Sequence, residues 1–205
     1  MQKILFFSIL GYISGGVLYA RLWGEILKKE NITENSKDGN PGTANAFLQG
    51  GFWCGILTLL CDLMKGFVPV WLYLQMAGPE VLLRLSTAFV IAAPVIGHAY
   101  PILYKFHGGK AIAVTFGVLL ALIPYWTPVL VLAISFLFFS LVICIQPHFY
   151  RTFVTYFVTM MIFAFSTIAV AVKGGFFLIT VAVATRLMKS KEPKERMQIK
   201  VLWTH

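Results

Sequence analysis

Long apolar runs separated by short polar breaks make up most of this chain. Because roughly 20 apolar residues cross the hydrocarbon core of a bilayer as a helix, the pattern predicts an all-α integral membrane protein with about seven transmembrane helices. The fourth and seventh runs are short, which indicates little tilt or only partial insertion. The predicted spans cover residues 4–23, 50–76, 81–97, 111–124, 126–146, 152–172 and 175–188.

Composition supports the membrane assignment. Hydrophobic residues make up 59% of the 205 residues and charged residues only 12%, and the mean hydropathy is +0.80. These values lie outside the usual range of soluble domains. About seven spans leave no room for a separate soluble domain, so residues 1–205 are expected to form a single polytopic membrane domain. The first run lacks a small-x-small cleavage site and is followed by Arg21, so we interpret it as an uncleaved helix.

Basic residues gather on one side of the expected bundle. If all the runs span, thirteen Lys and Arg residues lie on one side and three on the other. The positive-inside rule then predicts an outside amino terminus and a cytoplasmic carboxyl terminus for a multi-pass protein of the cell membrane. The larger group contains Arg21, Lys28, Lys29, Lys37, Lys105, Lys110, Arg151, Arg186, Lys189, Lys191, Lys194, Arg196 and Lys200, and the smaller one Lys3, Arg84 and Lys173.

The formal net charge of +9 has a simple explanation in a membrane chain. The basic tail, about 189–205, is expected to anchor the topology and to favour anionic lipid. No aromatic residues are interleaved with the charges, so a nucleic-acid partner is not expected. Cys54, Cys61 and Cys144 lie in apolar segments without disulfide or metal spacing, and no metal or other cofactor is expected.

A loop rich in glycine and polar residues precedes the second span, on the predicted cytoplasmic side. Gly39 and Gly42 let the backbone approach a ligand, while Asn40 and Asn45 add hydrogen-bond donors. Consecutive backbone N–H groups in such a loop can form an anion-binding nest. A tight turn between two spans is an equally good interpretation of these residue types.

A second glycine-rich loop precedes the fourth span on the same predicted side. Gly108 and Gly109 stand directly before the helix start, and Lys110 lies in its first turn. Open backbone donors and a cation at one point suit a phosphate, and an anionic ligand would explain a lysine at an unfavourable helix amino terminus. The alternative is that Lys110 only sets the topology and that His98 is an interfacial polar residue.

Two opposite charges lie within the second predicted span. Asp62 and Lys65 are spaced i, i+3 and can pair on one helix face. Ionisable groups at membrane depth usually face the bundle interior or a water-filled cavity. A structural ion pair and a direct role in a site are equally compatible with this spacing.

The order and spacing of these motifs resemble the PlsY-type glycerol-3-phosphate acyltransferases over roughly residues 5–120. The resemblance implies a seven-helix enzyme that transfers an acyl group from acyl phosphate to the 1-hydroxyl of glycerol 3-phosphate, giving lysophosphatidate without a metal. The matching motifs are Gly39-Asn40-Pro41-Gly42-x-x-Asn45, Asp62-x-x-Lys65-Gly66, Gly97-His98-x-x-Pro101 and Phe106-x-Gly108-Gly109-Lys110-Ala111.

The resemblance also implies roles for individual residues. Lys110 and His98 would act in catalysis, with the Gly108–Gly109 backbone beside Lys110 on a phosphate. The acyl chain would lie between helices and open to lipid. The facing polar loop would be formed by Gly39, Asn40, Gly42 and Asn45, with Asp62 and Lys65 supporting the site.

The chain departs from the family pattern at several positions. Asp38 replaces a serine and Leu48 a basic residue, and the final family motif is not recognisable between 186 and 196. In the loop after the fifth span, His148 and Arg151 stand where a serine is usual. An acidic residue in a phosphate loop is expected to repel the ligand.

Three functional interpretations follow. The first is a divergent but active acyltransferase, in which Arg151 or the basic tail supplies the missing positive charge. The second is a catalytically degenerate member that binds anionic lipid or a partner membrane protein. A small-solute transporter is least favoured, because the polar groups gather on one side and not at the midplane.

Overall fold

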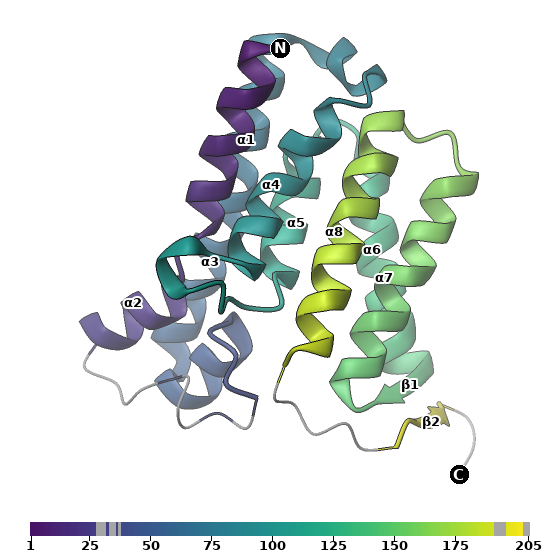
Figure 1. The fold of residues 1–205 in the computed structure, drawn as a ribbon. Helices are drawn as coiled ribbons and strands as arrows, with labels where there is room; N and C mark the ends of the chain where they lie inside the picture. Colours follow the sequence, from purple (N-terminus) through teal and green to yellow (C-terminus); the bar gives the residue numbers. More distant parts are fainter. Residues whose placement is uncertain (28–31, 33–35, 37, 191–195, 203–205) are drawn as a thin grey trace.

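The computed structural model describes residues 1–27, 32, 36, 38–190 and 196–202. The described chain forms a helical bundle with the amino terminus at one end and the carboxyl terminus at the other (Figure 1). The α-helices are α1 Gln2–Gly15, α2 Tyr19–Ile26, α3 Thr43–Ala77, α4 Thr87–Ala99, α5 Ile112–Leu120, α6 Thr127–Leu137, α7 His148–Phe165 and α8 Val170–Met188. Short 3-10 turns occupy Pro79–Leu83 and Ile102–Tyr104, a π turn occupies Phe138–Val142, and β1 Ile143–Gln146 pairs with β2 Gln198–Val201.

The helices support the membrane interpretation. In the described chain, three segments are long and apolar enough to cross a bilayer, namely Thr43–Ala77, Thr87–Tyr104 and Val170–Met188. The pair α1 and α2 also qualifies together, although it is bent by 42°. Helix α5 has 9 residues and α6 has 11, so these two are shorter than an upright span of about 20 residues.

Several predicted boundaries are wrong in detail. The run 4–23 is interrupted after Gly15, because the glycine pair at 15–16 weakens the helix and Leu18 leaves helical geometry. Residues 143–146, predicted as helix, form β1, where the β-branched Ile143 and Ile145 pair with a distant strand. The predicted span 152–172 ends at Phe165, and α8 begins at Val170. Within α3, Gly51 has φ 81° and separates a short first helix from the predicted span 50–76.

Close helix contacts depend on glycine. A Cβ at Gly15 of α1 would overlap the backbone of α4, and one at Gly97 of α4 would overlap the backbone of α1. In the same way Gly66 of α3 faces the backbone of α5, and Gly117 of α5 faces that of α3. Small residues let helices approach where dispersion contacts, and not the exclusion of water, drive their association.

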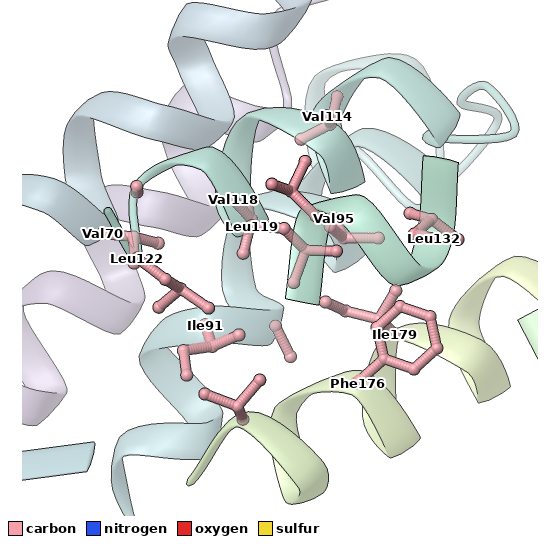
Figure 2. Packing of buried hydrophobic residues seen from close by; sticks show 14 of the residues in the cluster. Val70, Ile91, Val95, Val114, Val118, Leu119, Leu122, Leu132, Phe176 and Ile179 are labelled. Atoms are coloured by element: carbon pink, nitrogen blue, oxygen red, sulfur yellow. The ribbon is translucent and has the colours of Figure 1, made fainter. Parts of the chain in front are cut away.

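One apolar cluster joins α3 to α8. Figure 2 shows Ile91 of α4, Leu119 of α5, Leu132 of α6 and Phe176 of α8 converging in this cluster. Each of these side chains is fully buried. Large apolar side chains also cover the outside of the bundle, as expected where lipid replaces water. Examples are Leu5, Trp53, Leu60, Phe89, Ile134, Phe157 and Phe177.

Candidate functional site

A cavity of about 600 Å³ lies at the end of the bundle that carries the loop before α3. It is bounded by the segment 38–45, by α3, by the end of α4 and by the start of α5. Polar groups line one part and apolar side chains the rest, which suits an amphiphilic ligand with an anionic head. The polar part contains Asp38, Asn40, Asn45, Asp62, His98, Lys110 and His148, and the apolar part includes Leu48, Leu59, Val114, Phe116 and Phe136.

Asp38 and Lys110 form the charged centre of this cavity. The Lys110 Nζ lies 3.0 Å from Asp38 Oδ2. The other carboxylate oxygen accepts hydrogen bonds from Asn45 Nδ2 at 2.7 Å and from the Asn40 backbone N–H at 3.1 Å. Asn45 Nδ2 also donates to the Asn40 carbonyl at 2.8 Å. The loop before α3 is therefore organised around Asp38 and connected directly to Lys110, two residues before α5.

The electrostatics of Asp38 follow from these contacts. Burial alone would raise the pKa of the Asp38 carboxyl, but the Asn45 hydrogen bond and the charge of Lys110 outweigh it. The pKa of Asp38 is held below its ordinary value of 3.8, so the residue is ionised at neutral pH. The expectation that an acid here would only repel a phosphate is incomplete, because its charge is already matched by Lys110.

The turn that presents Lys110 is strained. Ala111, the N-cap of α5, has φ 59° in the left-handed region, which is unfavourable for a residue with a Cβ. Such strain persists where neighbouring contacts hold it. Here the Ala111 carbonyl accepts hydrogen bonds from both the backbone N–H and the hydroxyl of Thr115, each at 2.9 Å, and Lys110 is held by Asp38 on the other side.

A second buried network lies behind this pair. Lys65 Nζ is 2.7 Å from Asp62 Oδ1, 2.6 Å from the Val17 carbonyl and 2.7 Å from His98 Nδ1. An ammonium has three protons and no acceptor, so Lys65 donates to the Val17 carbonyl and to His98, and it forms an ion pair with Asp62. His98 Nδ1 must then accept, and the proton of a neutral imidazole resides on Nε2.

His98 also contacts the glycine pair before α5. Its backbone carbonyl accepts the Gly109 N–H at 3.1 Å, and a Cβ at Gly109 would overlap His98 Nε2. The Gly108 carbonyl accepts a hydrogen bond from Arg186 Nε of α8 at 2.9 Å. The glycine pair is thus held between α4 and α8, and its lack of side chains lets His98 reach the cavity.

His148 brings the first turn of α7 to the cavity. Arg151 lies behind it, with its guanidinium donating to His148 Nδ1 at 3.3 Å. The Thr152 hydroxyl lies 3.1 Å from the same nitrogen. Arg151 therefore contacts His148 and does not line the cavity itself. Among the described residues that line the cavity, only His148 comes from α7.

The structure brings most of the sequence-predicted residues together. Asn40, Gly42, Asn45, His98 and Lys110 line one cavity, and Asp62 lines it as well. Lys65 lies behind His98, and Gly39 forms the turn at φ 62° that follows Asp38. Lys28, Lys29, Lys37, Lys191 and Lys194 lie outside the described residues.

The contacts of two further residues were not predicted from the sequence. Thr43 lines the cavity, and its hydroxyl lies 3.4 Å from Asp62 Oδ2. Arg186 was interpreted as a topology and lipid-binding charge or, with the other basic residues of the tail, as a replacement for a missing arginine. In the structure it donates to the Gly108 carbonyl from the last turn of α8. The available signal was a basic residue in the final turn of a predominantly apolar helix.

A separate cavity of about 550 Å³ lies at the opposite end of the bundle. It is lined by the turns that follow α3, α5 and α7, including Glu80, Tyr125 and Ser166. The sequence motifs contribute no residue to its wall. The chemistry predicted from the sequence therefore belongs to the cavity around Lys110.

Proteins similar in sequence to this chain are glycerol-3-phosphate acyltransferases. Glycerol-3-phosphate acyltransferases from Mycoplasma pneumoniae and Photorhabdus laumondii are 38% and 35% identical over 134 and 122 residues, each match covering 60% of this chain. The matches cover 55% and 52% of these relatives, so the chain spans about half of their length. The enzyme of Staphylococcus saprophyticus is 33% identical over 144 residues, covering 68% of this chain and 69% of the relative.

The fold is similar to that of solved structures. The crystal structure of PlsY, an integral membrane glycerol 3-phosphate acyltransferase, in its glycerol 3-phosphate form aligns with a TM-score of 0.75 and 23% identity, covering 91% of this chain and 88% of that one. Its lysophosphatidic acid form aligns with a TM-score of 0.72. The sequence model of the glycerol-3-phosphate acyltransferase family matches residues 5–198. This chain therefore belongs to the glycerol-3-phosphate acyltransferase family.

Proposed function

We propose that this protein transfers a fatty acyl group from acyl phosphate to the 1-hydroxyl of glycerol 3-phosphate. The hydroxyl oxygen attacks the acyl carbonyl, the carbonyl–phosphate bond breaks, and the hydroxyl proton leaves with inorganic phosphate. The products are lysophosphatidate and phosphate. Because acyl phosphate carries its own good leaving group, the protein mainly needs to position two anionic reactants and offset their charge.

The two-part cavity around Lys110 supports this proposal most directly. Its polar part offers a lysine ammonium, amide side chains and a histidine, as a phosphorylated reactant requires. Its apolar part, with Leu59, Phe116 and Phe136, provides a surface for a hydrocarbon chain. One ligand with a phosphate and an acyl chain would fill both parts.

Lys110 is the proposed phosphate anchor. Its side chain is almost buried, where a charge–charge interaction is screened less than at the surface. Asp38 holds the ammonium toward the loop that carries Asn40 and Asn45. A bound phosphate would share Lys110 with Asp38 and add hydrogen bonds from the amide side chains.

His98 is proposed to act as a hydrogen-bond donor and not as a base. Its Nδ1 accepts from the Lys65 ammonium at 2.7 Å, so Nε2 carries the proton. Nε2 lies next to Gly109, and His98 itself lines the cavity. A donor at this place can stabilise the negative charge that develops on the carbonyl or phosphate oxygen. Lys65 and Asp62 are positioning residues in this scheme.

We further propose that all seven predicted runs cross the membrane, with the amino terminus outside and the cavity open to the cytoplasm. The protein is a multi-pass protein of a bacterial cell membrane, and the described basic residues at the cavity end outnumber those at the other end. At that other end, Lys3 donates to the Met76 carbonyl and Lys173 to those of Ala164 and Ser166. These lysines complete helix ends, a role that needs no cytoplasmic location.

The whole chain 1–205 is proposed to work as one domain. The apolar cluster joins α3 to α8 without interruption, and α1 packs on α4. Residues from α3, α4, α5 and α7 meet in the same cavity. Separation of the bundle into independent units would divide the site.

A direct assay tests the proposed reaction. Purified protein in lipid nanodiscs would receive acyl phosphate and labelled glycerol 3-phosphate, and lysophosphatidate and released phosphate would be measured together. Lys110→Ala is expected to lower kcat/KM by about 100-fold, a typical loss for one charge-stabilising group. Lys105→Ala, which removes a charge from the same loop outside the cavity wall, serves as the matched control.

Two outcomes of this assay would contradict the proposal. A well-folded wild-type sample that makes no lysophosphatidate would exclude the acyltransferase function and favour a degenerate member of the family. An active protein in which Lys110→Ala and Lys105→Ala behave alike would keep the reaction but refute the proposed phosphate site.

A further inference from the structure

The carboxyl-terminal segment returns to the bundle as a β-strand. Strand β2 pairs with β1 in antiparallel register, with Ile143 opposite Val201 and Ile145 opposite Ile199. The Leu202 N–H extends the pairing by donating to the Val142 carbonyl at 2.9 Å. This two-stranded ribbon lies at the cavity end of the bundle, below α6 and α7 (Figure 1).

The ribbon has one apolar face and one polar face. Successive side chains of a strand point to opposite faces, so the register assigns each residue to one of them. Each strand contributes two residues to each face. The apolar face carries Ile143, Ile145, Ile199 and Val201, and the polar face carries Cys144, Gln146, Gln198 and Lys200.

The apolar face is covered only in part. Ile145 of β1 is 4% exposed, whereas Ile199 and Val201 of β2 are 54% and 41% exposed. Because the protein covers this face at Ile145, the face is directed toward the bundle. The residues that bury Ile145 of β1 leave Ile199 and Val201 of β2 exposed.

The exposed half continues a surface that already faces lipid. The last turns of α6 and the π turn carry the exposed side chains of Leu137 and Leu141, and the chain passes from there directly into β1. Ile199 and Val201 are thus an extension of the lipid-facing surface of α6. A soluble protein surface would rarely leave such a strand uncovered.

The charge of the segment that contains β2 indicates what contacts its exposed apolar face. Residues 189–200 contain five basic and two acidic residues. Arg196 and Lys200 are exposed next to the apolar side chains of β2. Exposed apolar residues beside clustered cations are the pattern of segments that bind anionic membrane surfaces.

We propose that β2 lies in the headgroup region of the bilayer, with Ile199 and Val201 at the acyl boundary and Arg196 and Lys200 on anionic headgroups. This membrane contact would hold β1, and with it the first turn of α7 that carries His148. The inference does not depend on the acyltransferase function.

Spin labels test the orientation of β2. In a variant whose three cysteines are replaced by alanine, Ile199→Cys and the matched control Gln198→Cys would each be labelled in nanodiscs. One set would contain phosphatidylcholine alone, and the other equal parts of phosphatidylcholine and phosphatidylglycerol. With the anionic lipid, the label at 199 should collide several-fold more often with oxygen than with a water-soluble nickel complex, and the label at 198 should show the reverse.

The unaltered protein provides a second measurement. Trypsin should cleave after Arg196 and Lys200 several-fold more slowly in the anionic nanodiscs than in the neutral ones, while cleavage after exposed Arg84 at the other end should not change. Equal collision ratios at 198 and 199, or equal cleavage in both lipids, would overturn the proposal. Spin–spin broadening at 199 would also overturn it, because a second copy of the chain would then cover the face.

Discussion

The carboxylate of Asp38 lies 3.0 Å from the ammonium of Lys110, so the strongest candidate phosphate ligand already has an anionic partner. The same carboxylate accepts hydrogen bonds from Asn45 and from the Asn40 backbone. Asp38 therefore organises the loop and at the same time competes for the charge of Lys110. These two effects have opposite consequences for substrate binding, and substitution separates them.

Neutralising Asp38 should strengthen substrate binding. Asp38→Asn keeps the shape of the side chain and removes its charge, so a phosphate no longer shares Lys110 with a carboxylate. We expect KM for glycerol 3-phosphate to fall about tenfold, equivalent to roughly 1.4 kcal/mol, which is a modest part of the Coulomb energy of such a pair. Initial rates over a range of glycerol 3-phosphate concentrations measure the effect.

Asp38→Glu is the matched control, because it keeps the charge and lengthens the side chain by one methylene. Its KM should stay within a few-fold of wild type. A rise in KM for Asp38→Asn would contradict the competition between Asp38 and phosphate, and would mean that orientation of Lys110 is the dominant contribution of Asp38.

The same ion pair predicts an acid-sensitive stability. The pKa of Asp38 is lower in the folded protein than its ordinary value of 3.8, so its stabilising contribution is complete above that value. This contribution is lost as the pH falls through the still lower folded pKa. The Tm of wild type should exceed that of Asp38→Asn at pH 7, and the difference should shrink below about pH 4. Thermal unfolding in nanodiscs across this pH range would measure it, and a difference that grows on acidification would refute the pair.

The sequence predicted which residues line one cavity better than it predicted the helix boundaries around them. Glycines, amides and a lysine in two loops implied an anion site, and a resemblance to one family placed these loops together. The pairing of Asp62 with Lys65 could be expected from their i, i+3 spacing. The contact between Lys65 and His98 could not be expected from the sequence. His98 belongs to another helix, and only the packing of the bundle brings it to 2.7 Å from Lys65.

The fold details that were missed have a similar cause. Residues 143–146 are as apolar as the helix before them, and only the distant strand 198–201 makes them extended. Arg186 looks like any basic residue at the end of a membrane helix, and its role depends on the packing of α8 against α4. Local patterns predict local structure, whereas these features depend on contacts between remote segments.

The Lys65 contact predicts the tautomer of His98. Nitrogen-15 NMR of histidine-labelled protein should show His98 neutral at pH 7, with the proton on Nε2 and none on Nδ1. His98→Gln assigns the signal by its disappearance. The double variant Asp62→Asn/Lys65→Met removes the donor without leaving a buried carboxylate unpaired, and it should produce a mixture of both tautomers.

A signal from protonated Nδ1 in wild type would contradict the proposed donor role of His98. An unchanged tautomer in the double variant would show that Lys65 does not determine it. Activity gives an independent comparison, because a positioning role for Lys65 predicts a fall in kcat with a smaller change in KM.

Gly109→Ala provides the sharpest test of the cavity geometry. The added Cβ would overlap His98 Nε2 and would lie 3.1 Å from Asn40 Oδ1, so one of these groups must move. Either movement displaces a proposed ligand of the substrate, and a displacement of about 1 Å can cost about 100-fold in rate. We therefore expect kcat/KM to fall by about 100-fold while the Tm changes little, because the overlap lies at a cavity wall. Gly174→Ala is a suitable control, since its Cβ would meet only the side chains of Leu85 and Ala88, at 2.7 and 3.2 Å, and neither residue lines the cavity. Equal activity of the two variants would mean that His98 does not occupy the reactive part of the cavity.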